Sequence, residues 1–378
     1  MTFLSDCNNP SSSSSATLAS VLVSNVDMLT QILLRLPVKS LLVFKYVSKQ
    51  WFTLISDPFF CNKYNKLQKS LSIRGLYTQI DGSCGVSSRL QYVPLDGSTW
   101  TTSSAPFKTL DFINDPLGIT IVQSCNGLMC CRSNPRPVDD FYSTYYVCNP
   151  STRQYRSIIC ESKKREKGYE QLFSVSLAYD PLKSPHYKVV CIWLVAEPTS
   201  FIFCYQIEVY SSETASWKLS GEVYTFFDGT FFYFNVDREL RMEMRMPVYD
   251  KELYMEPKNF GECQGRLYLT LSRMSRHTNF EILEMKTDYT GWSKRYAVNL
   301  QEVVLAYPGF DFYLSYQFDV LLVREVEGES PKNMVLMRVE DKVFAYDLHD
   351  MSFKEIRKVT RENQENVAYQ YIETLASV

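Results

Sequence analysis

The sequence has little of what most enzymes need. Only three of its 378 residues are histidine, and they lie far apart at His186, His277 and His349. No two glycines are separated by a single residue, and neither a GxSxG nor an HExxH motif occurs. These absences argue against nucleotide binding, the common hydrolases, and a metal or other cofactor. We expect a non-catalytic protein.

Excess positive charge and long apolar runs are lacking as well. The chain has 40 Lys and Arg against 42 Asp and Glu, so its net charge of −2 gives no global field to hold a nucleic acid or an anionic membrane. The longest unbroken apolar run, 189–196, has eight residues, whereas a membrane-spanning helix needs roughly 20. No Lys or Arg precedes Arg35, unlike the start of a secretory signal. We expect the cytoplasm and/or the nucleus, with neither nucleic acid nor membrane as a partner.

Aromatic residues, in contrast, are abundant. The 26 Tyr, 23 Phe and 5 Trp outnumber the 14 Gly and 16 Pro, and 45% of the chain is hydrophobic. A chain of this length and composition can bury a large core. The 11 cysteines show no CxxC spacing, which favours reduced and mostly buried thiols.

The N-terminal part divides into two segments. Residues 1–20 contain a serine run at 11–15 and are predicted to be a disordered lead. Residues 21–69 predict a helical unit, because Ser48 and the Asp57-Pro58 pair mark helix boundaries there. The first helix ends at Pro37 and carries an apolar stripe at positions i, i+3, i+4 and i+7: Leu29, Ile32, Leu33 and Leu36. A unit this small and this apolar needs outside help to be stable, so we expect part of its apolar surface to face a partner.

Residues 70–365 predict an all-β domain, followed by a C-terminal tail at 366–378. Short apolar runs alternate with turn residues, and a large aromatic residue repeatedly follows seven positions after an apolar or aromatic one. The repeats are Val93 with Trp100, Cys148 with Tyr155, Tyr210 with Trp217, Met285 with Trp292, and Tyr346 with Phe353. About six blades of roughly 45 residues fit this length, so the fold class is α+β multidomain, with a helical unit before a propeller-like domain. A pair of two-sheet sandwiches is the alternative.

Specific motifs resemble those of a known family. Residues 36–42, Leu-Pro-Val-Lys-Ser-Leu-Leu, and the following residues up to 59 resemble the F-box of the large plant F-box families. Ser24 and Asn25 stand where that family usually has Leu-Pro. The downstream chain resembles the kelch-like F-box-associated β-propeller domain at 124–128 (Ser-Cys-Asn-Gly-Leu) and 149–153 (Asn-Pro-Ser-Thr-Arg).

The resemblance implies a function. An F-box binds a Skp-type adaptor, which connects to cullin and RING subunits, while the propeller captures an unknown target protein for ubiquitination. The chain would then be the non-catalytic substrate adaptor of a ubiquitin ligase, with no cofactor. Ten residues are expected to face the Skp-type adaptor or to pack directly beneath that surface: Leu29, Ile32, Leu33, Leu36, Pro37, Val38, Leu41, Leu42, Val47 and Trp51. The target-binding residues are not assigned.

Two other functions stay open. The protein could bind the adaptor but act outside a ligase. Alternatively, the propeller could be a sugar-binding or oxidase domain, in which Cys125, Cys130 and Cys131 would be the residues to test, although alternate strand positions favour packing for them.

Overall fold

The computed structural model describes residues 25–67, 73–80, 89–94, 110–134, 142–161, 169–196, 203–225, 231–247, 255–263, 265–273, 276–308, 318–326, 332–339, 342–358 and 368–378. All structural statements below concern these residues. The predicted disordered lead at 1–20 and the predicted anchor Trp100 lie outside them.

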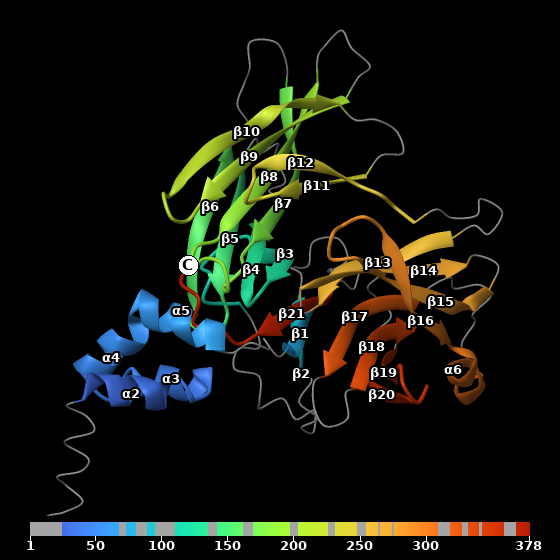
Figure 1. Ribbon diagram of the computed structural model, residues 1–378, viewed down its shortest axis with the longest axis horizontal. Coiled ribbons are helices and arrows are strands. Elements are labelled where there is room, and N and C mark those ends of the chain that lie inside the picture. The colour runs from blue at the N-terminus through green and yellow to red at the C-terminus, as the bar shows by residue number, and fades with distance from the viewer. Residues whose placement is uncertain are drawn as a thin grey trace, which may run out of the picture.

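The first described segment is a unit of four helices at one edge of the molecule (Figure 1). They are α2 (Val26–Leu33), α3 (Val38–Phe44), α4 (Lys49–Ser56) and α5 (Pro58–Leu67). Ser48 Oγ accepts a hydrogen bond from Trp51 N at 3.2 Å, which confirms the predicted cap of α4. Asp57 Oδ1 accepts from Phe59 N at 2.8 Å and so begins α5.

The rest of the described chain forms six antiparallel sheets and one short helix, α6 (Gln301–Ala306). One three-stranded sheet combines the start and the end of the domain: β1 (Ile73–Ile80), β2 (Arg89–Pro94) and β21 (Ala368–Ile372), in the order β2–β1–β21. The next sheet contains β3 (Ile119–Cys125), β4 (Leu128–Ser133), β5 (Tyr142–Asn149) and β6 (Gln154–Glu161). The third contains β7 (Tyr169–Ala178), β8 (Lys188–Ala196), β9 (Phe203–Ser211) and β10 (Ser216–Thr225).

The remaining three sheets follow in chain order: β11 (Phe231–Asn235) with β12 (Leu240–Met244); then β13 (Met255–Cys263), β14 (Arg266–Arg273), β15 (Arg276–Met285) and β16 (Trp292–Asn299); then β17 (Phe318–Val326), β18 (Lys332–Val339), β19 (Lys342–Asp347) and β20 (Phe353–Lys358). Five sheets have three or four strands, and the β11–β12 sheet is a lone hairpin. The prediction of helices followed by a propeller of about six blades is therefore confirmed.

The predicted aromatic repeats explain the outer hairpin of each four-stranded sheet. In every one, the two residues seven positions apart are direct cross-strand partners: Cys148 with Tyr155, Tyr210 with Trp217, Met285 with Trp292, and Tyr346 with Phe353. In three of these turns the residue two positions before the aromatic has a positive φ, namely Arg153, Ala215 and Met351. The repeated spacing of seven therefore corresponds to a tight turn and to one fixed register in each of these hairpins.

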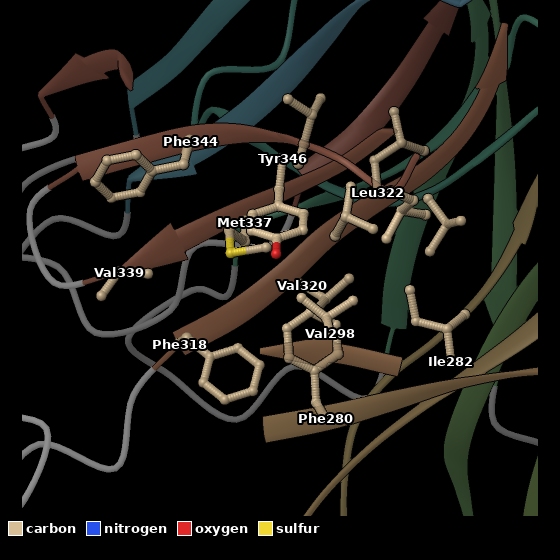
Figure 2. Close-up of a cluster of buried hydrophobic side chains, with 14 of the residues drawn as sticks. Phe280, Ile282, Val298, Phe318, Val320, Leu322, Met337, Val339, Phe344 and Tyr346 are labelled. Atoms are coloured by element: carbon tan, nitrogen blue, oxygen red, sulfur yellow. The ribbon is translucent and has the colours of Figure 1, made fainter. Parts of the chain in front are cut away.

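Buried side chains connect the sheets into a ring. One core joins β14–β16 to β17–β19 and to β1. Figure 2 shows side chains of this core, among which the rings of Phe280 and Phe318 lie against each other with centroids 5.0 Å apart. Further cores join the β1 sheet to β3–β5, and β4–β6 to β7–β9. Because β1 and β21 lie in the same sheet, an early and a late segment of the chain close the ring together.

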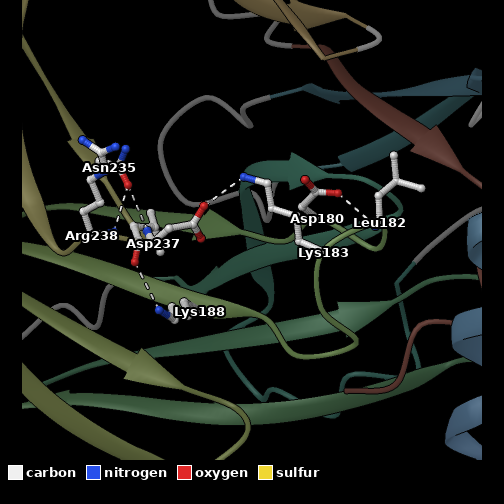
Figure 3. A network of polar contacts seen from close by, with 8 residues as sticks. Asp180, Leu182, Lys183, Lys188, Asn235, Asp237 and Arg238 are labelled. Carbon is white, nitrogen blue, oxygen red and sulfur yellow. Dashed lines mark hydrogen bonds and ion pairs between the residues drawn. The ribbon is translucent and has the colours of Figure 1, made fainter.

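The β11–β12 hairpin is fastened to its neighbours by polar contacts as well as by packing. Lys183 Nζ lies 2.9 Å from Asp237 Oδ2, and Lys188 Nζ donates to the carbonyl oxygen of Val236 at 3.1 Å (Figure 3). The pairing raises the pKa of Lys183 and lowers that of Asp237. On the other side, Trp292 Nε1 donates to the carbonyl oxygen of Arg245 at 2.9 Å. The shortest sheet thus bridges two four-stranded ones.

The predicted division at residue 366 is wrong for the described part of the last segment. Residues 368–372 form β21 and pair with β1, so they belong to the propeller rather than to a separate tail. Thr374, Leu375 and Ala376 are also buried. Tyr369 and Tyr371 alternate with smaller or polar residues, as a strand can, but so short a run does not reveal a pairing with a strand almost 300 positions earlier.

Candidate docking surface

The four helices form a core around three side chains that are completely buried, Leu33, Leu41 and Ile55. Tyr64 of α5 is buried too, and its hydroxyl donates to the carbonyl oxygen of Leu36 at 2.8 Å, which ties the connection between α2 and α3 to α5. Asn25 caps α2, since its Oδ1 accepts from Asp27 N and Met28 N, each at 3.2 Å. Ser24, the other residue at this departure from the family pattern, lies outside the described residues.

Outside this core the helices present many large apolar side chains to solvent. Nine of those in residues 25–67 are between 47% and 91% exposed: Val26, Met28, Ile32, Val43, Tyr46, Val47, Phe52, Phe59 and Leu67. Met28 and Ile32 are four residues apart, as are Val43 and Val47, so each pair falls on one side of its helix or its continuation. We call these nine side chains the docking surface. Exposed apolar groups gathered on so short a segment are typical of an interaction site.

The ten residues predicted to face or support a partner fall into three groups. Four lie in the core of the helical unit: Leu29, Leu33, Val38 and Leu41. Three are partly buried at its edge: Leu36, Leu42 and Trp51. Three are exposed: Ile32, Pro37 and Val47. The structure brings all ten into one small unit.

The structure adds seven side chains that were not among the ten predicted residues. They are Val26, Met28, Val43, Tyr46, Phe52, Phe59 and Leu67, all exposed. The sequence does contain a signal for two of them. Met28 with Ile32, and Val43 with Val47, are apolar pairs four residues apart that lie beside the stripe of core residues. Tyr46 and Phe59 stand outside any such pair, at helix ends.

Aromatic packing shapes one side of this surface. The rings of Phe44 and Trp51 meet edge to face with centroids 5.3 Å apart, which explains why Trp51 is only partly exposed. Beside them, Lys45 Nζ lies 5.9 Å from the centre of the Phe52 ring. Burial lowers the pKa of Lys45, and burial raises the pKa of the nearby Cys61 thiol to about 11. The thiol is therefore protonated at neutral pH and poorly nucleophilic.

The described residues contain no group of three or more His, Cys, Asp or Glu side chains placed to hold a metal ion. The cysteines around the 124–128 motif are packed into the sheets: Cys130 and Cys131 are completely buried, and burial raises the pKa of Cys125 to about 11. Among the described helices, none is long and apolar enough to cross a membrane.

Comparison with known families identifies the helical unit and the propeller. The F-box domain profile matches residues 25–63, which covers α2, α3, α4 and the first part of α5. The F-box associated beta propeller domain profile matches residues 93–234. The chain is a plant-type F-box protein. This confirms the resemblance carried by the motifs at 36–42, 124–128 and 149–153.

Several Arabidopsis thaliana proteins resemble this F-box protein. F-box protein At5g07610 is 29% identical over 419 aligned positions, which cover 98% of this chain and 96% of the relative. F-box protein At5g49610 is 33% identical over 201 positions, covering 51% of this chain and 49% of the relative. Putative F-box protein At4g17780 is 26% identical over 310 positions, covering 74% and 71%.

Proposed function

We propose that the protein is the substrate-recognition subunit of a Skp-cullin-F-box ubiquitin ligase. The helical unit would bind a Skp-type adaptor, and through it cullin and RING subunits, while the propeller holds the target protein. The observation that carries this proposal is the docking surface, because eight of its nine exposed apolar side chains lie on the segment that matches an F-box and the ninth, Leu67, follows shortly after it on α5. A surface of this kind gains free energy by excluding water from a partner, and it requires no bond chemistry in this chain.

The mechanism would be tethering. Linking a target to the same assembly as the conjugating enzyme raises its effective concentration, on the order of millimolar for linked modules. Orientation adds to this effect, because a held lysine meets the reactive group more often in a productive geometry. The chain itself would act without catalytic residues or a cofactor, in the cytoplasm and/or the nucleus, with neither nucleic acid nor membrane as a partner.

The burial pattern assigns different roles to the predicted adaptor residues. Ile32, Pro37 and Val47 are proposed to touch the adaptor directly, together with Met28 and Tyr46 of the docking surface. The buried leucines and Val38 would support this surface from beneath, as would the partly buried Leu36, Leu42 and Trp51. Large aromatic and aliphatic anchors of this kind dominate the energy of interfaces.

Co-purification of the full chain from native cells, with the proteasome blocked, tests the proposal. The natural chain is expected to bring down a Skp-type adaptor and cullin. The double variant Ile32→Glu with Val47→Glu should recover at least tenfold less adaptor than the natural chain, since two charges would be buried without partners at the interface. Leu305→Glu is the matched control, because Leu305 is a comparably exposed apolar residue, 64% exposed, on α6 of the propeller.

Each result has a distinct meaning. Recovery of adaptor without cullin would point to the function outside a ligase, and recovery of neither would overturn the proposal. Unchanged adaptor recovery by a folded double variant would show that the adaptor binds to a different surface of the protein.

A further inference from the structure

Residues 373–378 follow β21 and have no regular secondary structure, yet three of them are deeply buried. Thr374, Leu375 and Ala376 are each no more than 3% exposed. Irregular backbone seldom lies in a protein interior, because its N–H and C=O groups then need partners other than water. We call residues 373–378 the brace segment. In Figure 1 this end of the chain lies next to α5 and beside β5 and β6.

On one side the brace segment is bound by the helical unit. Asn65 of α5 is 3% exposed, and its Oδ1 accepts hydrogen bonds from Thr374 Oγ1 at 3.1 Å and from Leu375 N at 3.4 Å. The side chain of Leu375 is part of the same core as Leu33 and Leu41. The helical unit therefore completes its core with a residue that lies more than 300 positions away in the sequence.

On the other side the same residues are bound by the propeller. Asn149, at the end of β5, is completely buried, and its Nδ2 donates to the carbonyl oxygens of Thr374 at 3.1 Å and Ala376 at 2.8 Å. Its Oδ1 accepts from Ser151 N at 2.9 Å, and Thr374 N donates to Ser151 Oγ at 3.3 Å. Two residues of the Asn-Pro-Ser-Thr-Arg motif at 149–153 thus bind the brace segment.

A direct hydrogen bond between the two units is longer than those made by the brace segment. Asn65 Nδ2 donates to Tyr179 OH at 3.5 Å, at the limit of a hydrogen bond. By sequence, five residues, 68–72, connect α5 to β1. If the units were joined by a flexible connection of this length alone, its ends would be separated by about 12 Å on average, in no fixed direction.

We infer that the brace segment is a positioning element that holds the F-box helices in one orientation on the propeller, through the Asn65, Thr374 and Asn149 side chains. A buried hydrogen-bonded network has few satisfactory arrangements, so it selects one geometry where apolar contacts alone would tolerate several. The inference rests on the proposed function for its purpose: a target bound to the propeller would then face the conjugating enzyme from a fixed position.

Distance measurements on the full chain test the orientation directly. Spin labels attached to p-acetylphenylalanine at Lys49 and Glu213, one exposed residue in each unit, leave all cysteines in place. Pulsed electron paramagnetic resonance should give one narrow distance distribution for the natural chain. Asn65→Ala and Thr374→Val should each widen it at least twofold, and deletion of 373–378 should widen it further. Ser377→Ala is the matched control, since Ser377 is the exposed residue of the same segment, and it should leave the width unchanged.

Equal widths for Asn65→Ala, Thr374→Val and the natural chain would overturn the inference. Far-UV circular dichroism checks that each variant keeps its helix content, so that a wider distribution reflects the orientation of the helices and not their unfolding. The deletion also removes Leu375 and can unfold the helices, so the two point variants decide the matter.

Ubiquitination of the chain's own lysines gives a second readout. With Skp-type adaptor, cullin, RING and conjugating enzyme present, mass spectrometry should find a fixed subset of propeller lysines modified in the natural chain. At least twice as many sites are expected in Thr374→Val, because loosened units present more of the propeller. An identical set of sites in both chains would count against a positioning role. Failure to bind the adaptor at all would instead overturn the proposed function, while the distance measurement would still decide the role of the brace segment.

Discussion

The helical unit and the propeller distribute their apolar residues in opposite ways. Nine exposed large apolar side chains occur among residues 25–67, whereas all the other described residues together have twelve, spread over four of the sheets, α6 and three turns. The propeller instead places its aromatic residues between neighbouring sheets, as in the core that contains Phe280, Phe344 and Tyr346. The difference teaches that the same type of residue fills the core in one region and stays exposed, and so available to a partner, in the other.

The two regions also differ in how they complete their cores. Each four-stranded sheet packs against neighbours on both sides, so the ring supplies its own burial. The helices have one small core, and it includes Leu375 from the brace segment. A unit of about 40 residues has too little interior to be stable alone, which makes the helical unit dependent on the propeller in a way that the propeller does not require in return.

The same kind of core truncation should unfold the helical unit but not the propeller. Leu41→Ala and Leu336→Ala both remove a buried leucine, 0% and 1% exposed respectively, and each should lower stability by about 2–5 kcal/mol. The loss should unfold the small helical unit, with adaptor binding lost, while the propeller carrying Leu336→Ala stays folded at 25 °C. Urea unfolding followed by helical circular dichroism and tryptophan fluorescence separates the cases. Intact helices in Leu41→Ala would show that the unit is more stable than its size suggests.

Two glycines at matching turns should show how closely the propeller contacts the brace segment. Gly127 and Gly265 occupy the first hairpin turn of their sheets with φ of 90° and 78°. A Cβ at Gly127 would lie 2.4 Å from Thr374 Cγ2 and 2.9 Å from the carbonyl oxygen of Ile372, whereas a Cβ at Gly265 meets nothing within 4 Å. Gly265→Ala should therefore cost about 1 kcal/mol of backbone strain, and Gly127→Ala about 2–3 kcal/mol because overpacking is added.

Thermal or urea unfolding of the two glycine variants measures this difference. Equal losses would mean that the brace segment can move away from the turn without penalty. If the added Cβ displaces the brace segment as expected, the distance distribution between the two units should widen in Gly127→Ala but not in Gly265→Ala.

The local structure could be predicted from the sequence far better than the long-range contacts. The cap at Ser48 and the pairing of Tyr210 with Trp217 are set by neighbouring residues, so spacing and turn chemistry were sufficient. The docking surface could be predicted only in part. Leu29 and Ile32 occupy equivalent positions on the apolar stripe of the sequence, but Leu29 is buried and Ile32 is 48% exposed. Which side of a helix is covered depends on its neighbours, which periodicity does not contain.

The brace segment could not be predicted at all. Asn149 and Thr374 are 225 positions apart, and Asn, Ser and Thr are ordinary turn residues in a local pattern. The motif at 149–153 indicated a family but not the reason for its polar residues. Their role becomes visible only once the fold brings the brace segment between β5 and α5.

Alkaline pH should weaken the propeller more than the helical unit. Burial raises the pKa of Tyr187 to about 12, above the value near 10 expected when it is unfolded. Its contribution to stability is therefore complete below pH 10 and is lost as the pH rises to about 12, an effect of about 2 kcal/mol. Tyr145 and Tyr371 behave in the same way, each with a pKa raised to about 12 by burial. In the helical unit, the raised pKa of Cys61 also lowers stability as the pH rises, but the lowered pKa of Lys45 raises stability over the same change and opposes this loss.

Tyr187→Phe tests the alkaline prediction. The Tyr187 hydroxyl is buried without a hydrogen-bond partner among the described residues, so its removal should leave stability at pH 7 unchanged or slightly higher and should flatten the decline between pH 10 and 12. Tyr46→Phe, at an exposed ring, controls for the loss of a phenol. Urea unfolding at each pH gives the free energies, and an equally steep decline in Tyr187→Phe would contradict the assignment.

The smallest expected effect separates charge from hydrogen bonding at the contact between the two regions. Lys39 Nζ of α3 lies 3.7 Å from Glu373 Oε1 of the brace segment, and the Lys39 side chain is 59% exposed. Exposed pairs of this kind contribute about 0–1 kcal/mol and are screened by salt. Lys39→Ala should thus reduce stability by less than about 0.5 kcal/mol at low salt and leave the distance distribution between the units narrow. A widening as large as that of Thr374→Val would show that this charge pair orients the helices. A narrow distribution would leave that role with the buried contacts of the brace segment, which include the hydrogen bonds of Asn65 and Asn149 and do not depend on the surface charge.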